Sequence, residues 1–289
     1  MSLSFQASAN VSDENTVRRL EAQVKKWDGL KTDVYLSSAI NFDPDFPCFY
    51  SCWESGELVG FLCLFVPSQK EGEITAFVRP DRRRRGIFTS LFSYAVENLR
   101  EAGVSSLLLY YETGQRAAQA ISEKYGAKYH HSEYRMIYEG RTPGVLCDGY
   151  TLKKTEPEDI EDLVRLSAEL FEETEEQTRA MAERFERSPL MDTYLFYEGN
   201  VPVGTLRVNR EEGDCVSIWG LGILQSYRRR GLASKMLGET LRRLRETDER
   251  EIYLEVDSEN PNALGLYRKL GFVPSVQTDY DSLVLDAAL

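Results

Sequence analysis

Histidine and paired cysteine are scarce in this sequence. It contains two His, and its five Cys lack the paired spacing of a zinc site. An odd number of cysteines without a regular pattern also argues against a disulfide framework, so we expect reduced thiols and a cytoplasmic protein. These absences predict that the protein holds no metal.

Long apolar runs and excess positive charge are missing as well. No apolar stretch reaches the roughly 20 residues that a bilayer span requires, and the N-terminus lacks the basic and apolar regions of a signal peptide. The net charge is −12, whereas proteins bind phosphate backbones mainly through positive charge. We therefore expect no membrane insertion and no binding of nucleic acid.

The acidic charge is divided unevenly along the chain. Residues 1–145 carry 17 Lys and Arg against 18 Asp and Glu, and residues 146–289 carry 18 against 29. This asymmetry indicates two domains with different tasks. The chain of 289 residues, 42% of them hydrophobic, is long enough to build two ordinary cores.

The second half of the sequence repeats the first. A basic turn, Arg83-Arg84-Arg85-Gly86, matches Arg228-Arg229-Arg230-Gly231 at an offset of 145, and Gly126 matches Gly271 at the same offset. A chance match of two basic turns is the alternative, but the shared spacing to a second glycine argues against it. Repeats of this kind are the signature of duplicated structural units.

The offset changes by one residue within the repeat. Leu58–Leu62 matches Pro202–Leu206 at an offset of 144, which requires one inserted residue before the next strand. We place the two domains at residues 1–145 and 146–289.

Hydrophobic periodicity predicts the same order of elements in both halves, with a strand meander, a helix after the basic turn, a buried strand, a further helix and a closing strand. In the first half the expected strands are 48–53, 57–66, 71–78, 105–111 and 128–138, and the helices are 13–30, 82–100 and 115–124. In the second half the strands are 149–152, 193–197, 201–208, 216–223, 251–256 and from 272 onward, and the helices are 156–171, 175–185, 232–245 and 260–270. The fold class is therefore mixed α/β (α+β).

The basic turn of the second half has the form of an anion site. It joins an apolar strand, residues 218–224, to a helix that begins near Leu232. The first backbone amides of a helix have no internal acceptor and attract anions. Gly231 allows close approach of the backbone, and Ala233 keeps the helix start free of bulk. A pyrophosphate fits this turn, although a solvated basic surface is the plainer alternative.

Two alternating glycines lie in the strand before that turn. Gly220 and Gly222 weaken a regular strand, which indicates a bulge or the close approach of another backbone or a ligand. Tight packing under a neighbouring segment would explain them equally well.

A capped helix follows the buried strand of the second half. Asn260 is a favourable N-cap with Pro261 at the first helical position, and Gly271 ends the helix in the left-handed conformation. Tyr267 lies about two turns after Asn260 and so shares its face. The tyrosine is either a functional group or an ordinary core aromatic.

These two motifs resemble those of the GNAT superfamily of acyl-CoA-dependent N-acyltransferases. The first is Q/R-x-x-G-x-G/A, which stands here as Arg228-Arg229-Arg230-Gly231-Leu232-Ala233. The second is N-x-x-A-x-x-L-Y-x-x-x-G-F, which stands here as Asn260 to Phe272. The resemblance extends over the second copy and more loosely over the first, so the chain resembles a tandem GNAT protein, an architecture shared with mycothiol synthase.

The resemblance implies two GNAT-like domains, each a mostly antiparallel sheet flanked by helices, and acetyl-CoA as co-substrate. It implies that the amides after Arg228 hold the pyrophosphate and that the main chain of Leu221 or Ile223 polarises the thioester. It further implies that Asn260 contacts the pantetheine and that Tyr267 protonates the departing thiolate. The cofactor-binding residues implied are Leu221, Ile223, Arg228, Arg229, Arg230, Gly231, Leu232, Ala233 and Asn260.

No general base is evident from the sequence. The meander strand has Asp214 before it and Ser217 within it, and water relayed to Asp214, Glu255 or a terminal carboxylate remains open. An acetyltransferase acting on a small-molecule or peptide amine is the function expected, with a non-catalytic acyl-CoA-binding regulatory module as the alternative.

The first copy has lost the chemical positions. Phe88 stands where the second copy has Ala233, and its ring is expected to crowd a pyrophosphate. Gln115 replaces Asn260, and Ser122 replaces Tyr267. We therefore expect a catalytically silent first domain with a structural or acceptor-binding role.

The acceptor's charge stays open. Residues 156–186 contain 12 acids on two helices that, by the resemblance, flank the acceptor groove. They could attract a cationic amine, or they could form an ordinary solvated helix face.

Overall fold

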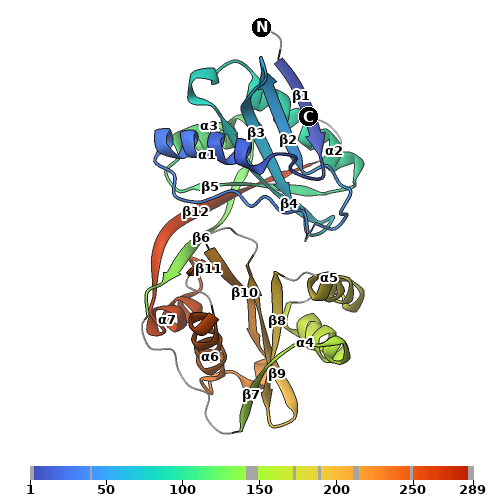
Figure 1. Cartoon of the computed structure of the whole chain (residues 1–289), viewed down its shortest axis with the longest axis vertical. Helices are drawn as coiled ribbons and strands as arrows, with labels where there is room; N and C mark the ends of the chain where they lie inside the picture. The colour runs from blue at the N-terminus through green and yellow to red at the C-terminus, as the bar shows by residue number, and fades with distance from the viewer. Residues whose placement is uncertain are drawn as a thin grey trace. The chain divides into compact units, whose positions relative to one another are not determined.

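The protein folds into two compact α/β units (Figure 1). The computed structural model describes residues 3–39, 41–140, 149–171, 174–187, 190–210, 215–247 and 250–285. The first unit consists of Met1–Ser132 with Val276–Leu289, and the second of Glu133–Ser275.

The first unit is built on a sheet of order β1-β2-β3-β4-β5-β12, in which β4 and β5 are parallel and the other neighbours are antiparallel. Helix α1 covers one face, and α2 and α3 cover the other (Figure 1). The elements are β1 (Leu3–Ser8), α1 (Glu14–Asp28), β2 (Phe49–Glu54), β3 (Glu57–Phe65), β4 (Glu71–Val78), α2 (Ile87–Glu101), β5 (Ser106–Glu112), α3 (Arg116–Tyr125) and β12 (Phe272–Val284).

The second unit repeats this plan with the order β7-β8-β9-β10-β11-β6, in which β10 and β11 form the parallel pair. Helices α4 and α5 lie on one side of the sheet, and α6 and α7 on the other (Figure 1). The elements are β6 (Lys128–Tyr138), β7 (Tyr150–Lys154), α4 (Ile160–Phe171), α5 (Glu175–Arg187), β8 (Met191–Glu198), β9 (Val201–Asn209), β10 (Cys215–Ile223), α6 (Leu232–Thr247), β11 (Glu251–Asp257) and α7 (Pro261–Lys269).

The sixth strand of each sheet comes from the other half of the sequence. In the first unit, Thr278–Val284 of β12 pairs with Ser106–Glu112 of β5. In the second, Glu133–Ile137 of β6 pairs with Tyr253–Asp257 of β11. The compact units therefore differ from the contiguous division at 145/146, because strand pairing moves the C-terminal strand to the first unit and the end of β6 to the second. The proposed linker around Thr142-Pro143-Gly144 lies outside the described residues.

The predicted helices and strands are present with small shifts at their ends, and the order of elements in the repeat is confirmed. One finding differs from expectation. Strand β1 has no predicted counterpart and pairs with β2. Trp27, at helical spacing from Val17, Leu20 and Val24, is 73% exposed, whereas those three side chains are buried. The apolar stripe of α1 therefore ends one turn before the helix does.

Candidate active site

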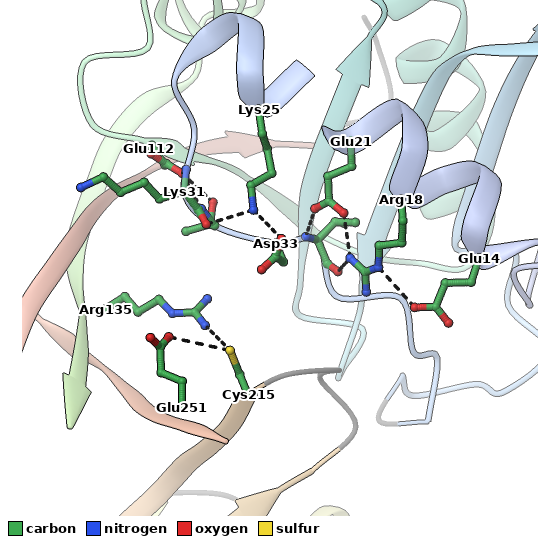
Figure 2. Close-up of polar contacts among 12 residues, drawn as sticks. Glu14, Arg18, Glu21, Lys25, Lys31, Asp33, Glu112, Arg135, Cys215 and Glu251 are labelled. Carbon is green, nitrogen blue, oxygen red and sulfur yellow. Dashed lines mark hydrogen bonds and ion pairs between the residues drawn. The ribbon is translucent and has the colours of Figure 1, made fainter. Parts of the chain in front are cut away.

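Strands β10 and β11 are paired at one end only. Cys215–Ser217 pair in parallel with Glu251–Tyr253, and no further pair joins these two strands among the described residues. At the paired end, Arg135 Nη2 lies 3.6 Å from Cys215 Sγ, which lies 3.8 Å from Glu251 Oε1 (Figure 2). The Arg135 guanidinium also stacks 3.5 Å above the ring of Tyr253. These contacts hold the strands together at the end opposite the opening.

The opening begins with a β-bulge in β10. Its pairing with β9 shifts by one residue between Trp219 and Gly222. Gly220 has φ +57°, a conformation that side-chain-bearing residues rarely adopt. A bulge leaves residues outside the ladder and bends the strand, so backbone groups here become available to a ligand. The bulge is confirmed at Gly220, whereas tight packing accounts for Gly222, where a Cβ would stand 2.8 Å from Leu170 Cδ1 of α4.

A cavity of about 260 Å³ lies where the strands part. It has room for a small group at the reacting end of a larger molecule, and polar and apolar side chains both line it. The lining residues are Phe171, Ile218, Trp219, Gly220, Leu221, Leu254, Glu255, Val256, Asp257, Asn260, Ala263 and Tyr267.

Tyr267 reaches the cavity from α7. Its side chain is 8% exposed and packs edge-on against Phe272, with ring centroids 5.9 Å apart. Within the described part of the chain its hydroxyl has no hydrogen-bond partner. Burial raises the pKa of the Tyr267 phenol above its ordinary value, because a charged phenolate is poorly solvated there. The group therefore stays protonated at neutral pH and is available as a proton donor.

Asn260 lies at the cavity because it caps α7. Its Oδ1 accepts a hydrogen bond from the Ala263 amide at 3.0 Å, and Pro261 occupies the first helical position as expected. The oxygen is thereby engaged, which leaves the side-chain NH₂ as the group that can face a ligand.

The turn after β10 presents unbonded amides. Arg229 has φ 62° and Gly231 has φ 73°, so both are in the left-handed region. The first amide to bond back into the helix is that of Lys235, which donates to Gly231 O at 3.2 Å. Among the described residues, the amides from Arg229 to Ser234 have no acceptor. A helix start of this kind favours an anion.

The three arginines of the turn differ in their surroundings. Arg228 Nε donates to the carbonyl of Ile223 at 2.9 Å and so fixes the turn to the end of β10. Arg230 forms a two-bond ion pair with Glu198. The hydrogen bond from Arg230 is the main cause of the lowered pKa of the Glu198 carboxyl. Arg229 is exposed and has no partner among the described side chains, so it is the arginine available to an incoming anion.

Sequence and structure agree in part on the site. The cavity brings together Leu221, Asn260 and Tyr267, and the turn from Arg228 to Ala233 follows the same strand. Ile223 is buried outside the cavity lining, with its carbonyl bonded to Arg228. Of the two residues suggested to polarise a thioester, Leu221 is therefore the one at the cavity.

Sequence reasoning left out the aromatic wall of the cavity, Phe171 and Trp219. Their contribution depends on how α4 packs against the sheet, and no local pattern indicates that. Of the candidate bases, Glu255 lines the cavity, whereas Asp214 and the C-terminal carboxylate lie outside the described residues.

The acetyltransferase (GNAT) family model matches residues 15–127 and again 158–272. The chain belongs to the GNAT family, in tandem form. No curated protein matches the sequence significantly.

Solved GNAT structures share the fold over the whole chain. A GCN5-related N-acetyltransferase from Sphaerobacter thermophilus is 19% identical with a TM-score of 0.78, and the match covers 99% of this chain and 97% of that one. A tandem GNAT protein from the clavulanic acid biosynthesis pathway is 17% identical, with a TM-score of 0.75 and full coverage of both chains. A putative acetyltransferase from Pyrococcus horikoshii is 17% identical, with a TM-score of 0.67 and coverage of 98% and 89%. At these identities the likeness shows the fold.

In the first GNAT copy, residues at the equivalent positions form hydrogen bonds within the protein. Ser122, at the position of Tyr267, is buried and donates to Asp281, which also accepts a hydrogen bond from Tyr111 at 2.6 Å. Glu112 closes the end of β5, because one of its oxygens accepts hydrogen bonds from the amides of Lys31 and Thr32 at 2.6 and 2.7 Å (Figure 2).

The basic turn of the first copy is paired with acids. Arg83 donates to both oxygens of Asp28, and the buried Glu54 accepts from Arg82 and Arg85. The hydrogen bond from Arg82 and then that from Arg85 lower the pKa of the Glu54 carboxyl. Three of the arginines of this turn are thus paired with carboxylates of the protein.

Phe88 differs from its expected role. Its half-buried ring stacks on Phe92, with centroids 5.5 Å apart. It packs toward the core of its own unit, so crowding of a pyrophosphate by this ring stays a prediction.

The described helices include none that is long and apolar enough to cross a membrane. The same residues contain no group of three or more His, Cys, Asp or Glu side chains arranged to hold a metal ion.

Proposed function

We propose that the second GNAT unit transfers an acetyl group from acetyl-CoA to an amine by direct attack. The observation that carries the proposal is the single cavity in which Leu221, Asn260 and Tyr267 meet, next to the anion-binding turn. Family membership supports acyl transfer. Acetyl as the acyl group and an amine as the acceptor are the finer parts of the proposal.

The residues of the site have complementary tasks in this reaction. Unbonded amides from Arg229 to Ser234 bind the pyrophosphate, with Arg229 as the exposed cation. Backbone N–H groups of the bulge at Gly220 and Leu221 stabilise the negative charge that develops on the thioester oxygen when the amine attacks. Asn260 orients the pantetheine through its side-chain NH₂.

Tyr267 completes the reaction by donating its phenolic proton to the departing thiolate. The raised pKa keeps that proton in place until a strong base forms beside it. Two carboxylates line the cavity, those of Glu255 and Asp257, and Asp257 accepts a hydrogen bond from the Glu259 amide at 2.7 Å. We assign Glu255 as the group that receives the proton lost by the amine, directly or through water.

The acceptor's charge is less tightly constrained. Glu161 of α4 forms a two-bond ion pair with Arg179 of α5, both at 2.7 Å, so part of the acidic charge is already neutralised. Glu175 and Glu176 are exposed and remain able to attract a cation. Glu172 and Glu173 lie outside the described residues.

An amine panel tests the function. Free thiol released from acetyl-CoA is measured with small amines, polyamines, aminoglycosides, amino acids and peptides, and product mass identifies the acetylated acceptor. We expect release that depends on one acceptor class and is lost in Tyr267→Phe. Saturable acetyl-CoA binding without release on any amine supports the alternative, a non-catalytic regulatory module.

A further inference from the structure

The extra residue of the second copy lies inside β10. In the first copy, β4 pairs with β3 from Glu73 to Val78 in one unbroken register. Counted from the paired ends of the equivalent strands, Gly220 and Leu221 together occupy the interval that Ala76 alone occupies in β4. The insertion expected before this strand is therefore the bulge itself.

The side chain opposite the bulge is a buried arginine. Arg207 pairs with Trp219 across the two strands and is 4% exposed. Its guanidinium carbon lies 5.0 Å from the centre of the Trp219 ring and 5.7 Å from that of Phe171. Nη2 donates to Ser167 Oγ at 3.4 Å. The guanidinium of Arg207 therefore lies near two aromatic rings and against Ser167 of α4.

The guanidinium also lies against the bulged backbone. A Cβ atom built on Gly220 would stand 2.7 Å from Arg207 Nη1, closer than real contacts allow. Glycine at position 220 suits the positive φ, and a larger residue would also displace the end of the Arg207 side chain. The fit is mutual, since the bulge provides the space in which the planar group lies.

The first copy provides the comparison without the arginine. Cys63 stands at the position of Arg207, and Thr75, which pairs with it, is followed by a strand without a bulge. A buried thiol is small, and it donates toward Tyr35 O at 3.2 Å. The large side chain and the inserted glycine thus occur together in one copy and are both missing from the other.

We propose that Arg207 is a positioning residue that holds the inserted residue of β10 in its bulged form. The guanidinium packs beside Gly220 and near Trp219, so its removal takes away a contact that supports the bulged backbone. Trp219, Gly220 and Phe171, which contact Arg207, also line the cavity. Arg207 therefore sets the position of the backbone amides that face the reacting group, although it does not line the cavity itself.

The effect on catalysis rests on the proposed function, whereas the effect on the strand does not. Misplacing reacting groups by about 1 Å can cost on the order of 100-fold in rate. Binding of acetyl-CoA should change less, because the turn from Arg228 to Ala233 is left intact.

The experiment compares Arg207→Met and Arg207→Lys with Arg210→Met. Arg210, the residue that follows β9, forms an ion pair with the buried Asp192 and serves as the control for general loss of stability. A variant with Gly220 deleted shows what a straight β10 does. Crystal structures give the β9–β10 register, calorimetry gives the Kd for acetyl-CoA, and thiol release gives kcat.

Arg207→Met keeps the inserted residue, so we expect the shift between Trp219 and Gly222 to move along β10, whereas in the deletion variant it should disappear. kcat should fall about 100-fold while the Kd for acetyl-CoA changes by less than about threefold. Arg207→Lys should recover part of the rate because it keeps the positive charge. Recovery should be incomplete because lysine lacks the planar guanidinium that lies near both rings.

Two results overturn the proposal. One is an unchanged register in Arg207→Met, and the other is turnover equal to that of Arg210→Met. If the wild-type protein transfers no acetyl group, the proposed function fails by itself, and the register of Arg207→Met still decides the role of the arginine.

Discussion

The two copies keep the same basic turn and differ in the strand before it. Arg84 and Arg229 have φ of 64° and 62°, and Gly86 and Gly231 have φ of 79° and 73°. In contrast, β4 is regular and β10 is bulged. The left-handed conformation of the turn is therefore common to both copies, including the copy whose arginines are paired with acids.

The comparison indicates which features belong to the fold and which to chemistry. Ser122 and Glu112 tie the first copy's site to its own core and loops, whereas Tyr267 and Asp257 at the matching positions line a cavity. That the first copy is catalytically silent stays a prediction, which matched variants of the two copies test.

The largest difference should come from the tyrosine. Tyr267→Phe removes the donor for the departing thiolate, and we expect kcat to fall about 100-fold with little change in acetyl-CoA affinity. Ser122→Ala in the first copy is the matched control and should leave kcat unchanged. The assignment of the two copies is reversed if Ser122→Ala abolishes turnover while Tyr267→Phe retains it. Steady-state kinetics on both variants decides the question.

The next largest effect should come from Gly86 and Gly231, the left-handed glycines of the two basic turns. An added Cβ meets nothing within 4 Å at either Gly86 or Gly231, so substitution by Ala causes backbone strain alone, about 1 kcal/mol. Gly231→Ala should raise the KM for acetyl-CoA roughly tenfold, because the turn relaxes away from its binding geometry. Gly86→Ala should lower stability by a similar amount without changing KM. Equal KM increases in both variants would show that the first copy also takes part in binding.

A smaller effect tests the acidic helices of the second copy. Replacing Glu175 and Glu176 together by Gln should raise the KM for a cationic acceptor about threefold at low salt, and less at high salt. Glu97→Gln on the exposed side of α2 is the control. An unchanged KM at every salt concentration would leave these acids as a solvated face.

The smallest effect concerns pH. In the proposed mechanism the Tyr267 phenol acts in its protonated form, and burial raises its pKa, so the acid persists at every pH below that value. We expect kcat to rise as the amine loses its proton, with no fall attributable to Tyr267 below about pH 10. A decline between pH 7 and 9 in the wild type that disappears in Tyr267→Phe would contradict this. Rates measured from pH 6 to 10 provide the test.

Local pattern explains why so much of the fold was predictable. Helix caps such as Asn260 and strand alternation act over a few residues. The duplicated sequence also shows the same order of elements twice. The sequence predicts least about the pairing of segments that are distant along the chain. No local sequence pattern indicates that β6 pairs with β11 and β12 pairs with β5, because either strand could pair with the edge of either sheet. The cytoplasmic location stays a prediction.

Short motifs with local geometry were enough to predict the tandem GNAT repeat, the basic turn, and Leu221, Asn260 and Tyr267 at the cavity. Only the tertiary structure decided where the inserted residue lies and what holds it. That position depends on the register between β9 and β10 and on the packing of Arg207 against Trp219 and Phe171, which are contacts between side chains far apart along the chain.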